Sequence, residues 1–153
     1  FDESFFRLED VDFHTRALLA ENFKYGIVNT GFDCFYRIAE ERKVYSPFDF
    51  LRRTCDAAVL YYTKYCRTPF LSNSLKLSAG TIYQAYYSIL QNYKHSRISR
   101  KQFVDLEEIL FNSDILNSLS IYQRMIFKIA KLYHLYFLRI PGINRLLFKL
   151  LFV

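Results

Sequence analysis

The sequence predicts a predominantly α-helical protein with a short β element near its N-terminal end. Only 4 Gly and 3 Pro occur in 153 residues, and such scarce turn-forming residues argue against a sandwich of many short strands. Most apolar residues also recur at helical spacing. Because 52% of the residues are hydrophobic and 24% are charged, the composition is that of a single globular domain and excludes intrinsic disorder.

The first predicted helix runs from about Leu8 to Ala20, where apolar residues fall three and four positions apart. Glu9 and Asp10 occupy its first turn, and acids are favoured there because a helix N-terminus carries partial positive charge. Two short runs of β-forming residues follow at 25–29 and 32–36, separated by a turn-like Thr-Gly pair. These two runs are the β element of the prediction.

Helix caps and periodicity predict the remaining elements. Ser46, Pro47 and Asp49 supply an N-cap, a proline at the first helical position and an acid in the first turn, so a helix should extend from here to Cys66. Further helical patterns cover residues 78–93, 100–111 and 118–138, and a final apolar stretch covers 143–153.

The excess positive charge lies entirely in the last quarter of the chain. Residues 1–114 contain 15 Lys/Arg and 15 Asp/Glu, whereas residues 115–153 contain 6 Lys/Arg and no acid. These cations leave no uncharged run of about 18 residues, so a membrane-spanning helix is not predicted. Cations interleaved with Phe, Leu and Tyr are typical of a helix that lies on a membrane surface, and also of a bundle helix with a solvated polar face. Both interpretations stay open.

The cysteines, histidines and glycines exclude several classes of site. Cys34, Cys55 and Cys66 are an odd number without metal-site spacing, which favours a reducing compartment over a disulfide framework or a zinc site. The three histidines are far apart, and the four glycines form no phosphate loop, so a metal hydrolase and a P-loop protein are not indicated.

Since Phe1 begins the chain and Met125 is its only methionine, we expect the natural start to lie upstream.

The first 46 residues carry the most specific pattern. They contain the segments FDESFFRLEDVDFHTRALL and KYGIVNTGFDCFYR, which combine FDE, an ED-x-D-x-x-x-R pattern, extended chain and a YR pair. This order resembles the second half of the catalytic domain of family 2 glycosyltransferases, most closely the bacterial enzymes that build surface polysaccharides. The resemblance implies that residues 1–46 are the acceptor-side end of a GT-A type α/β domain. Residues 47–153 would then be a helical C-terminal extension with a basic amphipathic tail.

The resemblance also assigns roles to individual side chains. Asp10 would be the general base that takes the proton of the acceptor hydroxyl during inverting transfer. Glu9 and Asp12 would bind the acceptor. Arg37 and Arg42 would bind the donor diphosphate, for which the planar guanidinium fork is well suited.

A nucleotide-sugar donor and a glycan or lipid-linked acceptor are the partners that this resemblance implies. It further implies a divalent Mn or Mg ion held by an Asp-x-Asp motif in the nucleotide-binding half, and it places that half and its metal ligands outside this chain. The chain alone is therefore expected to be inactive. The complete enzyme would be cytoplasmic and peripheral at the inner face of the cytoplasmic membrane, which it would contact through the basic tail, with no nucleic-acid partner.

Simpler interpretations compete with this one. Two acids at a helix start are ordinary capping chemistry, and Asp12 and Arg16 can form a structural ion pair four residues apart. His14, four residues after Asp10, has only this spacing in favour of a role.

The alternative function is a helical interaction or peripheral membrane-binding module without catalytic activity. Its aromatic stripes would bind a partner or nucleic-acid bases, although tyrosines at helical spacing more often line a core; these stripes are Tyr61, Tyr62, Tyr65, Tyr83, Tyr86 and Tyr87.

Overall fold

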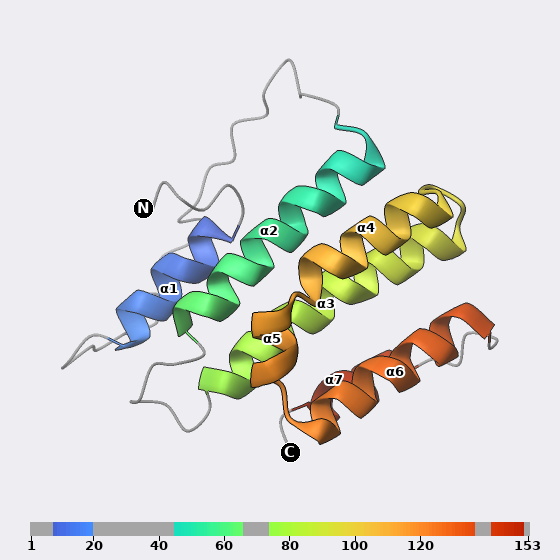
Figure 1. Cartoon of the computed structure of the whole chain (residues 1–153). Coiled ribbons are helices and arrows are strands. Elements are labelled where there is room, and N and C mark those ends of the chain that lie inside the picture. Colours follow the sequence, from blue (N-terminus) through green and yellow to red (C-terminus); the bar gives the residue numbers. More distant parts are fainter. Residues whose placement is uncertain (1–7, 20–44, 66–73, 137–141, 152–153) are drawn as a thin grey trace, which may run out of the picture.

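The protein is a bundle of helices in the computed structural model (Figure 1). The structure describes residues 8–19, 45–65, 74–136 and 142–151, and these ranges contain helices and no strand. The predominantly α-helical class is thus confirmed for them, while both predicted β runs lie outside the described residues. The helices are α1 (Glu9–Leu19), α2 (Pro47–Tyr65), α3 (Ser74–Lys94), α4 (Arg100–Leu110), α5 (Ser113–Ser118), α6 (Ile121–Tyr136) and α7 (Ile143–Leu150).

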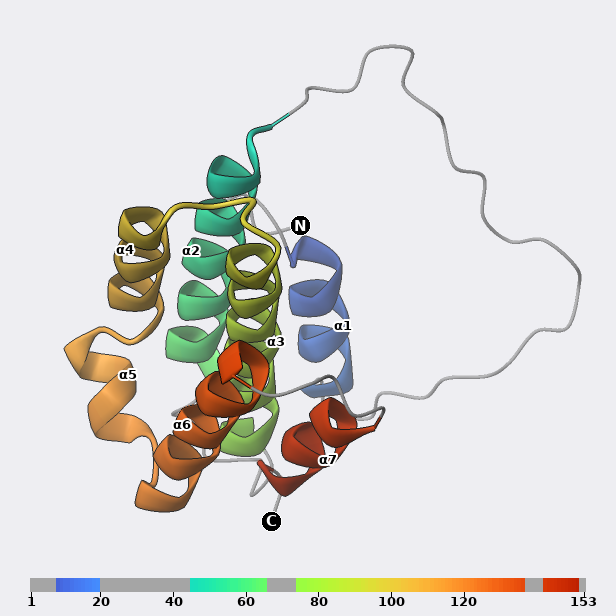
Figure 2. The same ribbon diagram turned by 90° about the vertical axis from the view of Figure 1, so that its right-hand side faces the viewer.

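α3 lies at the centre of the bundle, where α2, α4 and α6 all pack against it (Figure 2). Burial on several sides requires apolar residues around much of its circumference. The residues of α3 that are at most 2% exposed are Ala79, Ile82, Tyr83, Ala85, Tyr86, Ile89 and Leu90. The expectation that its tyrosines line a core is therefore confirmed for Tyr83 and Tyr86, and the Tyr86 hydroxyl donates to Oε1 of Glu107 on α4 at 2.7 Å.

Aromatic rings connect α3 to the C-terminal helices. The Phe127 ring of α6 lies 5.1 Å from that of Phe111, 5.8 Å from that of Tyr83 and 5.9 Å from that of Tyr86, measured between ring centroids. These separations and their tilted or edge-on geometries are the ones that aromatic pairs prefer. The Phe148 ring of α7 joins the same group at 5.9 Å from Tyr83.

Two helices begin with side-chain caps, of which the one at Ser46 was predicted. At α2, the Asp49 backbone N–H donates to Oγ of Ser46 at 3.1 Å, and the Ser46 hydroxyl donates to the Asp49 carboxylate at 2.6 Å. At α4, Ser99 and Gln102 form a reciprocal capping box. Such caps satisfy backbone N–H groups that have no partner within the helix.

The prediction of one continuous helix over residues 118–138 is wrong at its N-terminal end. α5 ends at Ser118, and α6 begins only at Ile121, because Ser120 and Gln123 form a second capping box. The Gln123 backbone N–H donates to Oγ of Ser120 at 3.1 Å, and the Gln123 side chain accepts from the Ser120 backbone N–H at 3.0 Å. This S-x-x-Q pattern is a helix start signal inside an otherwise continuous apolar periodicity.

Cys55 is a free thiol with no exposed surface in the core beside α3. Burial, and to a smaller extent the charge of Asp56, raises the pKa of this thiol to about 12. Cys55 therefore stays protonated near neutral pH and acts as a small apolar core residue. Cys34 and Cys66 lie outside the described residues.

None of the described helices combines the length and the apolar character needed to cross a membrane.

We expect Leu106→Ala to lower the free energy of unfolding by about 2–5 kcal/mol, because Leu106 of α4 has no exposed surface and its truncation leaves a cavity. The matched control is Val104→Ala on the same helix, where the side chain is 42% exposed and the loss should be about 0.5 kcal/mol or less. Urea denaturation of both variants measures the difference. Equal losses would contradict the packing of α4 described above.

Candidate functional site

The candidate site is the N-terminal end of α1. The predicted base Asp10 and its neighbour Glu9 are the second and first residues of this helix. Backbone N–H groups without helical partners gather at such an end, and together with the helix dipole they stabilise carboxylates. The side chains of Glu9 and Asp10 lie outside what the structure describes, and so do Arg37 and Arg42. The described geometry of the site therefore comes from Leu8, from the rest of α1, and from α2.

The backbone directly before the acid pair is strained. Leu8 has a φ of 65°, in the left-handed region, which costs a residue with a Cβ about 1–2 kcal/mol. Two kinds of contact offset this cost: the Leu8 carbonyl accepts the Asp12 backbone N–H at 2.8 Å, and the Leu8 side chain packs against Tyr61 and Tyr65 of α2. These contacts hold the backbone of Leu8, directly before Glu9 and Asp10, in this conformation.

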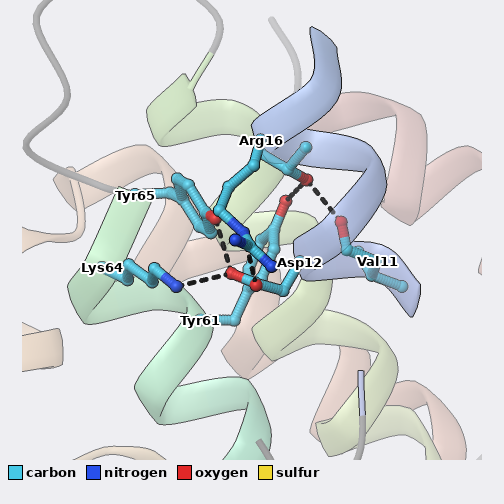
Figure 3. A network of polar contacts seen from close by, with 7 residues as sticks. Val11, Asp12, Arg16, Tyr61, Lys64 and Tyr65 are labelled. Carbon is cyan, nitrogen blue, oxygen red and sulfur yellow. Dashed lines mark hydrogen bonds and ion pairs between the residues drawn. The ribbon is translucent and has the colours of Figure 1, made fainter. Parts of the chain in front are cut away.

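A buried carboxylate joins α1 to α2 (Figure 3). Asp12 has no exposed side-chain surface. Its Oδ1 accepts from Nζ of Lys64 at 2.8 Å and from the Tyr65 hydroxyl at 2.6 Å, and its Oδ2 accepts from Nε of Arg16 at 2.9 Å. The predicted ion pair between Asp12 and Arg16 is confirmed, and the two partners from α2 are additional.

The donors around Asp12 keep it ionised. Burial by itself raises the pKa of this carboxyl, but the hydrogen bonds from Lys64 and Tyr65 and the charges of Lys64 and Arg16 outweigh it, so the pKa lies below its ordinary value of 3.8. Burial, then the hydrogen bond to Asp12 and its negative charge, raise the pKa of Tyr65 to about 12. Tyr65 is thus a hydrogen-bond donor throughout the physiological range.

Asp12 therefore has the environment of a structural anchor. Both of its oxygens accept hydrogen bonds from protein donors, and none of its surface faces solvent. The role in acceptor binding that the resemblance implies for Asp12 would require this network to open.

A second contact between the two helices lies one turn further along α1. The Thr15 hydroxyl donates to the Val11 carbonyl at 2.7 Å, and it lies 2.8 Å from the Tyr61 hydroxyl. Because Thr15 has only one hydroxyl proton, Tyr61 must be the donor in the second bond. The Tyr61 and Tyr65 rings themselves pack at 4.8 Å. Two anchors, at positions 12 and 15, thus hold the helix that begins with the acid pair.

Glu107 has a similar set of partners, the Tyr86 hydroxyl and Lys131, but it lies between α3, α4 and α6 and not beside α1. His14 is exposed, and its ring makes an edge contact with Phe13 at 5.7 Å. Within the described ranges, no group of three or more His, Cys, Asp or Glu side chains could hold a metal ion. The described residues thus do not fit a metal site, and we assign no chemistry to a metal here.

Lys64, Tyr65 and Tyr61 are the site residues that sequence reasoning missed. Lys64 and Tyr65 follow Asp12 by 52 and 53 positions, so no local spacing connects them to it. The signal in the sequence was the position of Asp12 on the apolar side of its helix. A carboxylate on a face that becomes buried needs hydrogen-bond partners.

Comparison of the chain with family models, with curated proteins and with solved structures finds no match in any of the three. Function is therefore inferred from the residues and their geometry.

Asp12→Asn should destabilise the protein in a pH-dependent way. Because the folded-state pKa of Asp12 is lowered, its ionised form adds stability above the pKa of the unfolded chain, and this is lost as pH falls through the folded-state pKa. At pH 7 we expect a loss of about 1.5–3 kcal/mol. This loss should shrink below about pH 4, where the unfolded carboxyl is protonated. Urea denaturation at several pH values measures it.

Asp56→Asn is the matched control, because Asp56 is an exposed acid on α2. Its effect should be small at every pH. A deficit of Asp12→Asn that stays constant down to about pH 2 would contradict the ionised network, since a linked deficit must change with protonation.

Tyr65→Phe should be energetically coupled to Asp12→Asn. The hydroxyl that Tyr65 loses bonds directly to the carboxylate, so a double-mutant cycle should give a coupling energy of about 0.5–3 kcal/mol. The control is Tyr122→Phe, an equivalent change at a tyrosine of α6 that is 46% exposed, and it should be additive with Asp12→Asn. Additivity in both cycles would show that the 2.6 Å contact contributes nothing to stability.

Proposed function

We propose that this chain forms the acceptor-side end of a family 2 glycosyltransferase of GT-A type, followed by a helical extension. The enzyme would transfer a sugar from a nucleotide-sugar donor to a glycan or lipid-linked acceptor with inversion. The observation that supports this best is that Glu9 and Asp10 open a helix which Asp12, fully buried, attaches to α2.

In this proposal Asp10 is the general base. The acceptor hydroxyl oxygen attacks the anomeric carbon from the side opposite the nucleoside diphosphate, a new carbon–oxygen bond forms, and the bond to the diphosphate breaks. The hydroxyl proton passes to the Asp10 carboxylate in the same step. A carboxylate in the first turn of a helix is stabilised in the ionised state that accepts this proton.

The position of residue 10 on α1 suits such a role. Residues two apart lie about 200° apart around a helix axis, since each residue turns the helix by about 100°. Asp12 faces α2, so the Cα of residue 10 lies on the opposite side of α1. Asp12 thus packs against α2, and this proposal assigns Asp10 to the substrate.

General-base catalysis is sensitive to geometry, and this gives the packing of α1 a functional consequence. A misplacement of about 1 Å can cost two orders of magnitude in rate. The Asp12 network and the contact between Thr15 and Tyr61 would hold the base against this loss. Arg37 and Arg42 would contact the donor diphosphate, and the metal ligands would belong to the nucleotide-binding half.

The second candidate function is an interaction or membrane-binding module without catalysis, at a cytoplasmic membrane face or elsewhere in the cell. One observation favours it, a row of exposed apolar side chains along α6. Membrane binding by itself is compatible with the transferase, because an enzyme that uses lipid-linked acceptors has to meet them at a membrane.

Asp10→Asn tests the proposed base in the complete enzyme, with its nucleotide-binding half and with Mn²⁺ or Mg²⁺. A panel of nucleotide sugars first identifies the donor. The variant should then lose about 10²–10⁴-fold in turnover, because the amide cannot accept the proton, while donor affinity stays nearly unchanged.

Asp49→Asn is the control, since Asp49 is likewise an acid in the first turn of a helix, α2, and should leave turnover unchanged. Turnover that survives Asp10→Asn would remove Asp10 as the base. Failure to turn over any donor would favour the module without catalytic activity.

A further inference from the structure

α6 has two apolar faces, and only one of them packs in the bundle. Its inner face contributes Ile126, Phe127 and Ala130, each at most 5% exposed, to the core. Its outer face carries apolar side chains that recur in alternating steps of three and four residues and so form one continuous row along the helix. We call them the outer row of α6; they are Tyr122, Met125, Ile129, Leu132 and Tyr136, with exposures of 46%, 53%, 48%, 55% and 76%.

The outer row forms a larger continuous apolar surface than the single exposed apolar side chains that are common on protein surfaces. Ile121, at the start of the helix, extends it with a side chain that is 78% exposed. α6 lies at the edge of the bundle in Figure 1, and the exposed fractions place the row on the solvent side of this helix. A contiguous apolar surface of this kind marks a place where another apolar body binds.

Cations flank the outer row on one side. Lys128 is exposed, three residues after Met125 and four before Leu132, and it forms no ion pair with another described residue. Arg124 lies one turn before it, while Lys131 is paired with Glu107 at 2.8 Å. No acid occurs after Asp114 in the sequence, so α6 itself carries none. Glu107 and Glu108 of α4 line the same groove as the three cations, which still outnumber them.

α7 has the opposite arrangement. Its Leu147 is 5% exposed, its neighbour Leu151 is 2% exposed, and both belong to the core, as do the partly buried Ile143 and Phe148 that pack against it. Its cations Arg145 and Lys149 are exposed. The apolar side of the last helix is thus largely used inside the protein, and α6 offers the larger free apolar surface.

We propose that the outer row of α6 docks on a bilayer that contains anionic phospholipid. Aliphatic side chains of the row would enter the interface between head groups and acyl chains, its tyrosines would lie at head-group depth, and Arg124 and Lys128 would contact lipid phosphates. This inference does not rest on the transferase proposal, because it uses no residue of α1.

Charge decides between the bilayer and the other occupants. A second copy of the chain would bring together two grooves in which three cations, Arg124, Lys128 and Lys131, face two acids, Glu107 and Glu108, and this excess of like charge opposes association. A nucleic acid would match the cations, but the rings of Tyr122 and Tyr136 lie at the two ends of the row, and the three side chains between them offer no ring on which bases stack. Only an anionic bilayer is complementary to both the apolar row and its cationic edge.

Sedimentation of the full chain with phospholipid vesicles tests this proposal. The chain should bind vesicles of phosphatidylcholine with about 30% phosphatidylserine, and bind pure phosphatidylcholine at least about tenfold more weakly, because each basic residue near an anionic surface adds about fivefold to the partition coefficient. Raising the salt concentration should weaken binding, because it screens the exposed cations.

The decisive variant is Met125→Asp with Leu132→Asp, both on the outer row and more than half exposed, so that the fold should be kept. It should lower the partition coefficient at least about tenfold, because charge in place of apolar surface opposes insertion at the interface. The matched control is Phe13→Asp with Phe50→Asp, which changes the net charge equally at side chains of α1 and α2 that are 48% and 44% exposed. Thermal unfolding checks that both variants fold.

Three outcomes would overturn the proposal. The first is failure of the unaltered chain to bind anionic vesicles, and the second is an equal loss of binding in the decisive and control variants. The third is a dimer of the unaltered chain that the decisive variant converts to a monomer, which would assign the outer row to a second copy. None of these measurements needs a sugar donor, so the result is independent of whether the chain is part of a transferase.

Discussion

The burial of α3 is the constraint on which the bundle depends. A helix that packs against α2, α4 and α6 can keep only a narrow strip in water, and α3 accordingly buries tyrosines as well as aliphatic residues. Buried tyrosines bring hydroxyl groups that need partners. The Tyr86 hydroxyl donates to Glu107, which in turn pairs with Lys131 of α6. The same packing that forms the core thereby links three helices through polar groups at its edge.

Asp12 links the N-terminal helix α1 to the bundle through polar contacts in a similar way. A charged group without exposed surface is tolerated only if its charge is neutralised and its oxygens accept hydrogen bonds, and here Lys64, Tyr65 and Arg16 meet both conditions. The network is specific, because an uncharged or displaced partner would leave a buried carboxylate unsatisfied. It therefore determines which face of α1 meets α2. The same choice leaves the Cα of Asp10 on the far side of the helix.

The two proposals concern different parts of the molecule and different kinds of chemistry. One rests on a sequence pattern, an ED pair ahead of an anchored helix, and the other on the exposed apolar row of α6 and the charges beside it. They are physically compatible, since a transferase that uses a lipid-linked acceptor works at a membrane surface and a docked α6 would keep it there. Each can fail without the other, because a donor-free vesicle assay and a turnover assay measure separate properties.

The helical class, the stretches that became α1 to α4 and the ion pair between Asp12 and Arg16 could all be predicted from the sequence. These follow from local rules, in which caps such as Ser46 and spacings of three and four residues act within one or two turns. The break at Ser120 also has a local signal, the S-x-x-Q pattern, but the prediction followed the apolar periodicity that continues across it. The partners of Asp12 on α2, more than 50 positions away, and the identity of the buried face of α6 follow only from the packing of the helices. Contacts between distant segments depend on how whole helices pack, and apolar periodicity alone cannot tell an inner face from an outer one.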